Sequence, residues 1–151
     1  MLTFTIPQYL QAAQTFQAML AKTGFKLVID SLERLAWIAK AQTFDGWEIA
    51  FWGWGAVSDP DALSRNLVST GLGNWSGVVN PQRDQLMAAG RAEYDLVKRS
   101  GIYKNVQQTV YDEAHIVFTY KTVANQVYQK YVKGMTSDFY DFNAAEVWLD
   151  K

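Results

Sequence analysis

Cysteine is absent from the 151 residues of this chain, and histidine occurs once. A chain without cysteine has no disulfide bond, no thiolate metal site and no cysteine nucleophile. The formal net charge is −1, and no run of basic residues offers the surface with which proteins bind nucleic acid. Every apolar stretch falls short of the roughly 18 residues that a membrane-spanning helix needs. We therefore set nucleic acid aside as a partner and expect no membrane span.

The chain is, by contrast, rich in apolar and aromatic residues. Hydrophobic residues make up 49% of the sequence, which is enough to bury a core, and the length is that of about one domain. Aromatic residues reach 15% and include six tryptophans, an excess that requires an explanation. Residues 1–6 lack the positive charge and the apolar run of a signal peptide, so we expect the chain to begin directly on folded structure.

Hydrophobic periodicity over the first fifty residues alternates between the strand and the helix pattern. It predicts strands at 2–6, 25–30 and 47–52, the last of them buried, and helices at about 9–20 and 32–39. Such a β-α-β-α-β order predicts an α/β fold, with helices packed on a mixed sheet.

Two details of the helical pattern are specific enough to test. We expect Gly24 to end the first helix, and apolar residues at helical spacing predict the second. The apolar residues concerned in the second helix are Leu32, Leu35, Ala36, Ile38 and Ala39.

The remainder of the chain opens with a segment rich in glycine and proline, residues 53–82. Within it, Asp59-Pro60-Asp61 is a helix start signal, because an aspartate caps well and a proline suits the first turn. Two further helices are predicted at about 83–98 and 100–114. Strands are predicted at 116–120 and 123–128, and a tail from residue 132 to the end completes one α/β unit.

Sequence motifs for catalysis are absent. His115 has no serine or cysteine motif around it, and we expect it to be structural. No zinc-protease, nucleophile-elbow or phosphate-loop pattern occurs. Asp59 and Asp61 could form a carboxylate pair, but aspartates that flank a proline more often cap a helix. We therefore predict a protein that is not an enzyme, with no catalytic residue, no metal and no cofactor.

The segment from Trp47 to Trp75 carries the most unusual pattern. Trp52 and Trp54 end a predicted strand and lie beside glycines, where large aromatic side chains with an N–H group can wall a small-molecule site. Asp59, Asp61 and Asn74 bring polar groups to the same region. On the pattern alone, the equal alternative is that these tryptophans fill a core beneath a long loop.

Five segments in chain order resemble the oligopeptide/dipeptide-binding family of extracellular solute-binding proteins (family 5), the ligand-capturing components of bacterial ABC importers. They are "QAAQTFQAMLAKTGFKLVI" (11–29), "FDGWEIAFWGWGAVSDPDAL" (44–63), "NWSGVVNPQRDQLM" (74–87), "DLVKRSGIYKNVQQTVYDEAHIVFTY" (95–120) and "VKGM" (132–135). Each is weak singly, whereas the five together cover nearly the whole chain.

The resemblance implies one lobe of a two-lobed receptor of the periplasmic-binding-protein type (type II). Residues 1–135 would be the C-terminal ligand-binding lobe, and residues 136–151 a tail that returns to an N-terminal lobe missing from this chain. It further implies a periplasmic or extracellular location, with a lipid anchor in some family members, and a permease partner. The ligand would be a peptide or another small solute, bound without chemistry.

The site expected from the resemblance and the pattern together comprises Trp52, Trp54, Val57, Ser58, Asp59, Asp61 and Asn74. Family members that bind peptides often carry an aspartate three residues beyond the Gly-Trp tryptophan, where it pairs with the peptide's amino terminus. Val57 stands there in this chain, so a neutral ligand such as an oligosaccharide is the alternative reading unless Asp59 substitutes.

We expect the tail, from about residue 136 onward, to lack the N-terminal lobe against which it would pack. Phe142, Trp148 and Leu149 would then be exposed, packed differently, or buried in a non-native self-association with a second copy.

Overall fold

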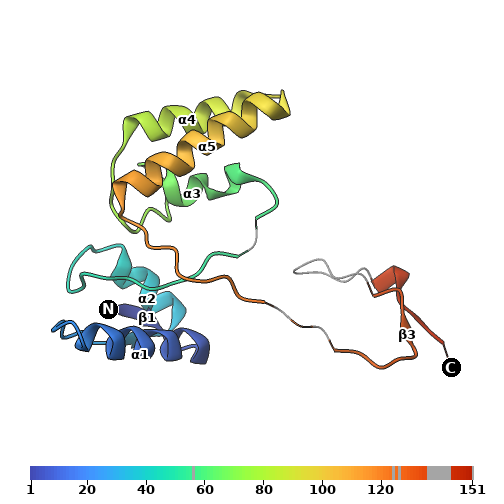
Figure 1. Ribbon diagram of the computed structural model, residues 1–151, viewed down its shortest axis with the longest axis horizontal. Coiled ribbons are helices and arrows are strands. Elements are labelled where there is room, and N and C mark those ends of the chain that lie inside the picture. The colour runs from blue at the N-terminus through green and yellow to red at the C-terminus, as the bar shows by residue number, and fades with distance from the viewer. Residues whose placement is uncertain (56, 124, 126, 136–143, 151) are drawn as a thin grey trace. The chain divides into compact units, whose positions relative to one another are not determined.

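The computed structural model describes residues 1–55, 57–123, 125, 127–135 and 144–150 (Figure 1). The chain divides into two compact units, Met1–Ile116 and Val117–Lys151, which we describe separately. In the part of the chain that the structure describes, no helix has the length and apolarity to cross a membrane.

A small parallel sheet lies at the start of the first unit. Strand β1 (Leu2–Phe4) pairs in parallel with β2 (Asp30–Leu32), so that Leu2 faces Asp30 and Phe4 faces Leu32. On its other side, β1 forms an isolated parallel bridge to Ala50. Helices α1 (Pro7–Ala21) and α2 (Arg34–Ala41) both contact β1, as Figure 1 shows. This arrangement confirms the β-α-β-α part of the predicted order, and the bridge at Ala50 takes the place of the third strand.

The strands are shorter than predicted, and the predicted strand 25–30 was wrong over most of its length. Two carbonyl groups of that segment accept hydrogen bonds from groups that are not part of a neighbouring strand. Gln17 Nε2 donates to Leu27 O at 2.7 Å, and the chain's amino terminus donates to Val28 O at 2.6 Å. Of the predicted buried strand 47–52, the structure forms only the isolated bridge at Ala50. The side chains of residues 47–52 are half-buried or exposed.

Helix α1 ends just before the glycine that was predicted to terminate it, and α2 confirms the predicted second helix. Gly24 has φ +87°, a left-handed conformation that glycine adopts without strain. In α2, however, Trp37 and Ala41 are wholly buried, whereas Leu35 is 81% exposed. Two residues at i, i+4 spacing thus carry the contact of α2 with the sheet.

The rest of the first unit is helical. It consists of η1 (Pro60–Leu63), α3 (Ser64–Leu67), α4 (Pro81–Ala92) and α5 (Leu96–Glu113). Asp59, Asn80 and Asp95 each accept a backbone N–H at a helix start. The predicted break between the last two helices, near residue 99, was wrong, because the Asp95 cap starts α5 earlier in the chain.

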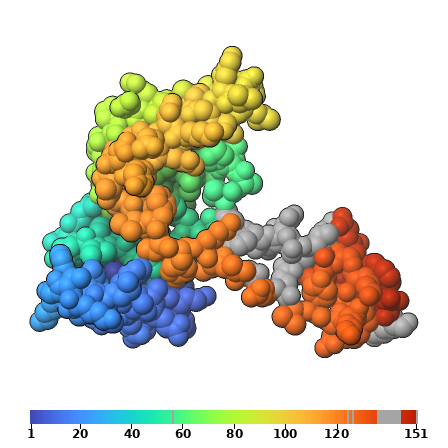
Figure 2. Space-filling model, in the orientation of Figure 1, coloured from blue at the N-terminus to red at the C-terminus, as the bar shows by residue number. Residues whose placement is uncertain are grey.

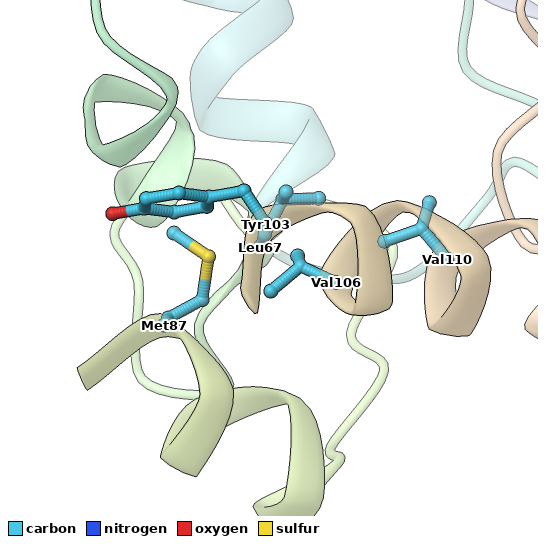
Figure 3. Close-up of a cluster of buried hydrophobic side chains, with 5 residues drawn as sticks. All are labelled: Leu67, Met87, Tyr103, Val106 and Val110. Atoms are coloured by element: carbon cyan, nitrogen blue, oxygen red, sulfur yellow. The ribbon is translucent and has the colours of Figure 1, made fainter. Parts of the chain in front are cut away.

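A hydrophobic core joins α3, α4 and α5 (Figure 3). Its buried members are Leu67, Met87, Tyr103, Val106 and Val110. The two long helices approach closely at Gly90, where a Cβ atom would lie 2.8 Å from the Tyr103 ring. Glycine at this position therefore permits the packing of α4 on α5.

The second unit contains an antiparallel pair of short strands. Strand β3 (Val132–Lys133) pairs with β4 (Trp148–Leu149), which follows the turn η2 (Ala144–Glu146). Trp148 and Leu149 are 56% and 55% exposed, whereas Phe142 lies outside the described residues.

The strands predicted at 116–120 and 123–128 are not formed by those of their residues that the structure describes. Alternating polarity predicts which side chains share a face, but a strand also requires a neighbouring segment for its backbone groups.

Candidate ligand-binding site

Four tryptophans from three segments of the first unit form a cluster. Trp37 comes from α2, Trp52 and Trp54 follow the Ala50 bridge, and Trp75 comes from the loop between α3 and α4. Trp75 lies with its ring centroid 4.7 Å from that of Trp37 and 5.4 Å from that of Trp52, at interplanar angles of 81° and 79°. Trp52 and Trp54 are 6.1 Å apart at 77°. Such edge-to-face contacts are favourable, because the positive edge of one ring meets the negative face of the next.

The cluster packs on the core and is also partly exposed. Trp37 is wholly buried with Leu2 and Ala41, and Trp52 and Trp75 pack against this core. Trp52, Trp54 and Trp75 themselves stay partly exposed. The tryptophans thus cover the core with one part of their surface and offer indole surface to solvent with the other.

Asn74 holds the loop that carries Trp75. Its side chain is 8% exposed, and its Nδ2 donates to Ser69 O at 3.1 Å and to Val78 O at 3.0 Å. Its Oδ1 accepts the Ser76 hydroxyl at 2.9 Å. Because these bonds occupy both ends of the amide, Asn74 positions Trp75 within the cluster.

Both carboxylates of Asp59-Pro60-Asp61 are bound by arginines of the two long helices. Asp59 Oδ1 accepts the Asp61 N–H and the Arg99 Nη2 group, each at 2.8 Å. Asp61 accepts Arg91 Nε at 2.9 Å and Nη2 at 3.1 Å, one bond to each oxygen. The hydrogen bond from Arg99 lowers the pKa of Asp59 below its ordinary 3.8, and Asp61 raises the pKa of Arg91.

Arg99 links this loop to the helical core. Its Nε donates to Gly90 O at 3.0 Å, and its guanidinium lies 4.9 Å from the centre of the Tyr103 ring, a cation–π contact. Burial raises the pKa of the Tyr103 hydroxyl. An open groove of about 320 Å³ lies where Pro60 meets α5, the yellow-to-orange helix of Figure 2. Its other lining residues are Leu96, Arg99, Ser100, Tyr103, Lys104 and Gln107.

The other predicted site residues are less constrained. Val57 is 45% exposed, and Ser58 is exposed and makes no side-chain hydrogen bond to a described residue. The structure therefore brings Trp52 and Trp54 together and ties Asp59 and Asp61 to helices. The sequence analysis missed Arg91 and Arg99, which lie 30 and 40 residues from their partners and carry no local signal.

His115 lies in a separate group of polar residues at the end of α5. Its Nδ1 is 3.1 Å from Glu113 Oε2, and Glu113 also accepts bonds from Arg83 and Asn80. Burial lowers the pKa of His115 below its ordinary 6.5 and outweighs the opposing effect of Glu113, while Arg83 adds to the lowering. Among the residues that the structure describes, no three histidines or carboxylates are grouped so that they could hold a metal ion.

Comparison with known proteins gives the family context of this geometry. No family model matches the chain. A "Probable di/tripeptide-binding protein 5" of Pseudomonas aeruginosa is 32% identical over 108 residues, which are 68% of this chain and 20% of the relative. Over about two thirds of its length, the chain is thus homologous to a di/tripeptide-binding protein. The family resemblance predicted from the five motifs is thereby confirmed.

Two solved structures of substrate-binding proteins have the same fold. The ABC transporter substrate-binding protein CtaP of Listeria monocytogenes matches with a TM-score of 0.67 and 23% identity, over 76% of this chain and 24% of its own. The periplasmic binding protein DppA of Helicobacter pylori, in complex with the peptide STSA, matches with a TM-score of 0.71 and 22% identity. This second match covers 99% of the present chain and 30% of DppA. The predicted α/β fold of the periplasmic-binding-protein type is therefore confirmed.

These substrate-binding relatives are much longer than the present chain. The chain spans about a fifth of the length of the curated relative that it matches, and 24% and 30% of the two solved structures. The tryptophan cluster and the paired carboxylates are thus features of one part of a substrate-binding fold.

Proposed function

We propose that this chain is part of the ligand-capturing component of an ABC importer for peptides, and that it binds its ligand without catalysis. The observation that carries the proposal is the 32% identity to a di/tripeptide-binding protein across 108 residues. The peptide present in the DppA structure supports the same ligand class. Peptide is accordingly the ligand that we retain over the oligosaccharide alternative.

The order of the five motifs supports a place for the chain within the receptor. We assign residues 1–135 to the C-terminal lobe and residues 136–151 to a tail that returns to an N-terminal lobe. The complete receptor would close its two lobes over the peptide in the periplasm or outside the cell, with or without a lipid anchor. It would then deliver the peptide to the membrane permease of the importer.

The partly exposed indoles of Trp52 and Trp54 are suited to the contact with a peptide. An indole can cover an apolar side chain of a ligand with its broad face. One lobe supplies only part of the buried contact area, and association has a large entropic cost. We therefore expect the chain by itself to bind peptides weakly, with a Kd of roughly 1 mM.

Proton–nitrogen NMR can test this proposal, because each of the six tryptophans contributes a resolved indole N–H signal. The full chain is titrated with STSA, trialanine and trileucine up to about 10 mM. We expect the signals of Trp52 and Trp54 to move in a saturable way. The Trp148 signal, from an exposed residue of β4 in the second unit, serves as the control and stays in place.

The same samples test the absence of catalysis and the ligand class. Mass spectrometry should recover every peptide uncleaved, and maltotriose should move none of the signals. Cleavage of a peptide would contradict binding without catalysis. Saturable shifts with maltotriose alone would contradict the peptide assignment.

A further inference from the structure

Residues 51–54 lie between two groups of aromatic side chains. Phe51 has its ring centroid 5.8 Å from that of Tyr9 and 5.5 Å from that of Phe16, both of which belong to α1. Trp52, the next residue, instead contacts other members of the tryptophan cluster. Phe51 therefore faces α1 and Trp52 faces the opposite side, which is the alternation of an extended segment.

Gly53, which separates the two indole-bearing residues, is the point at which this segment meets Tyr9. A Cβ atom at position 53 would lie 2.5 Å from the Tyr9 hydroxyl oxygen and 3.4 Å from Cζ of the same ring. Gly53 is not among the residues of positive φ, so its backbone conformation would admit a larger residue. The glycine therefore accommodates the Tyr9 hydroxyl and not an unusual backbone conformation.

The Tyr9 ring is itself fixed on two sides. Its centroid lies 5.2 Å from that of Phe4 at an interplanar angle of 86°, and 5.8 Å from that of Phe51 at 65°. Phe4 belongs to β1 and packs against the buried core around Trp37. The ring could move away from Gly53 only by giving up these edge-to-face contacts, so α1 supports the segment with a firmly held side chain.

We infer that Tyr9 is a positioning residue for the ligand contact, because it supports the backbone at Gly53 and thereby sets how Trp52 and Trp54 are presented. Gly53 is bonded directly to both tryptophans, so a shift of its backbone moves both indoles. The inference rests on the proposed function and adds a residue of α1 that touches no ligand itself.

The test uses the methyl group of an alanine to disturb this contact. Gly53→Ala places a carbon atom against the Tyr9 hydroxyl. In the full chain without ligand, we expect the indole N–H signals of Trp52 and Trp54 to move. In a titration with trialanine up to about 50 mM, we expect the Kd to rise roughly fivefold.

Removal of the Tyr9 hydroxyl should reverse this effect. In Tyr9→Phe/Gly53→Ala the nearest ring atom lies 3.4 Å from the new methyl group, which is an ordinary contact distance. The Kd should return to within about twofold of that of Tyr9→Phe alone, and the two indole signals should return toward their positions in that variant. A tyrosine that only fills space between α1 and the sheet would change the melting temperature without this coupled recovery.

Two further variants complete the design. Gly101→Ala is the matched control, because its Cβ atom meets nothing within 4 Å, and it should leave the indole signals and the Kd unchanged. Tyr9→Leu removes the ring without adding an atom at Gly53 and should move the same two indole signals. It tests the inference even where Gly53→Ala does not fold, and unmoved signals in Tyr9→Leu would overturn it.

The remaining outcomes separate the inference from the proposed function. A Kd for folded Gly53→Ala within about twofold of the wild type would overturn the inference and leave peptide binding standing. A Kd that stays raised in the double variant would do the same, because the methyl group would then act without Tyr9. If the wild type binds no peptide, the proposed function fails. The signals of the ligand-free chain then decide whether Tyr9 sets the indole positions, which their recovery in the double variant would support and their failure to recover would contradict.

Discussion

Arg83 is wholly buried and donates from Nη1 to the carboxylate of Glu113, thirty residues further along the chain. The other guanidinium donors are also occupied, Nε by Leu67 O at 2.6 Å and Nη2 by Val78 O at 3.0 Å. One side chain of α4 thereby connects the end of α3, the loop after it and the end of α5.

Loss of Glu113 should destabilise the fold more than loss of Arg83. Glu113→Ala leaves a buried guanidinium without its counter-charge, and we expect the free energy of unfolding to fall by about 3 kcal/mol. Arg83→Met fills the site with apolar atoms and removes a donor from the carbonyls of Leu67 and Val78 and from Glu113. The charge that remains, on Glu113, is 20% exposed, so the loss should be smaller. Urea unfolding measures both, with the exposed Asp112→Ala as a control expected within about 0.5 kcal/mol of the wild type. Equal losses for the two variants would contradict the asymmetry.

Two glycines in the paired helices should respond oppositely to alanine. Gly90→Ala places a Cβ atom 2.8 Å from the Tyr103 ring, and we expect a loss of about 1–3 kcal/mol from overpacking. Gly101→Ala meets no atom within 4 Å and should gain up to about 1 kcal/mol, because alanine favours the helix. Thermal unfolding of both variants checks the difference. A stabilised Gly90→Ala would show that α4 and α5 do not approach each other as closely as the structure has them.

His115 should make the fold sensitive to mild acid. Since its folded-state pKa lies below the ordinary 6.5, folding favours the neutral imidazole. The stability that depends on this neutral form is present above 6.5 and is lost as the pH falls through the lower, folded-state value. We expect the melting temperature of the wild type to drop over this range and that of His115→Gln to drop less. Identical pH profiles for the two proteins would contradict burial as the cause of the pKa shift.

The Asp59 carboxylate should contribute to stability in two separable ways. Asp59→Asn keeps the cap of η1 and loses the ion pair with Arg99, whereas Asp59→Ala loses both, so the melting temperature should fall from wild type to Asn to Ala. The pKa of Asp59 is depressed, so its contribution is present above 3.8 and is lost as the pH falls through the folded-state value. The difference between wild type and Asp59→Asn should therefore vanish well below 3.8. A difference that is independent of pH would mean that the charge has no part in it.

The sequence determined the features of this protein that depend on near neighbours in the chain. The Asp59 cap, the termination after α1 at Gly24 and the helical face with Val106 and Val110 all involve residues a few positions apart. Such interactions leave a pattern that can be read locally. The order of five motifs likewise determined the family, since it requires only the positions of residues along the chain.

The tertiary structure alone decided which distant residues pack against each other or form ion pairs. The choice of Trp37 over Leu35 as the buried residue of α2 depends on Trp52 and Trp75, which come from later segments. Asp59, which the sequence placed among the candidate ligand groups, is paired with Arg99, forty residues away. Burial, ion pairing and strand pairing act between residues that are distant in the chain and adjacent in space. Only the folded arrangement therefore shows that arginines bind the carboxylates of this loop, whereas the indoles of Trp52, Trp54 and Trp75 stay partly exposed.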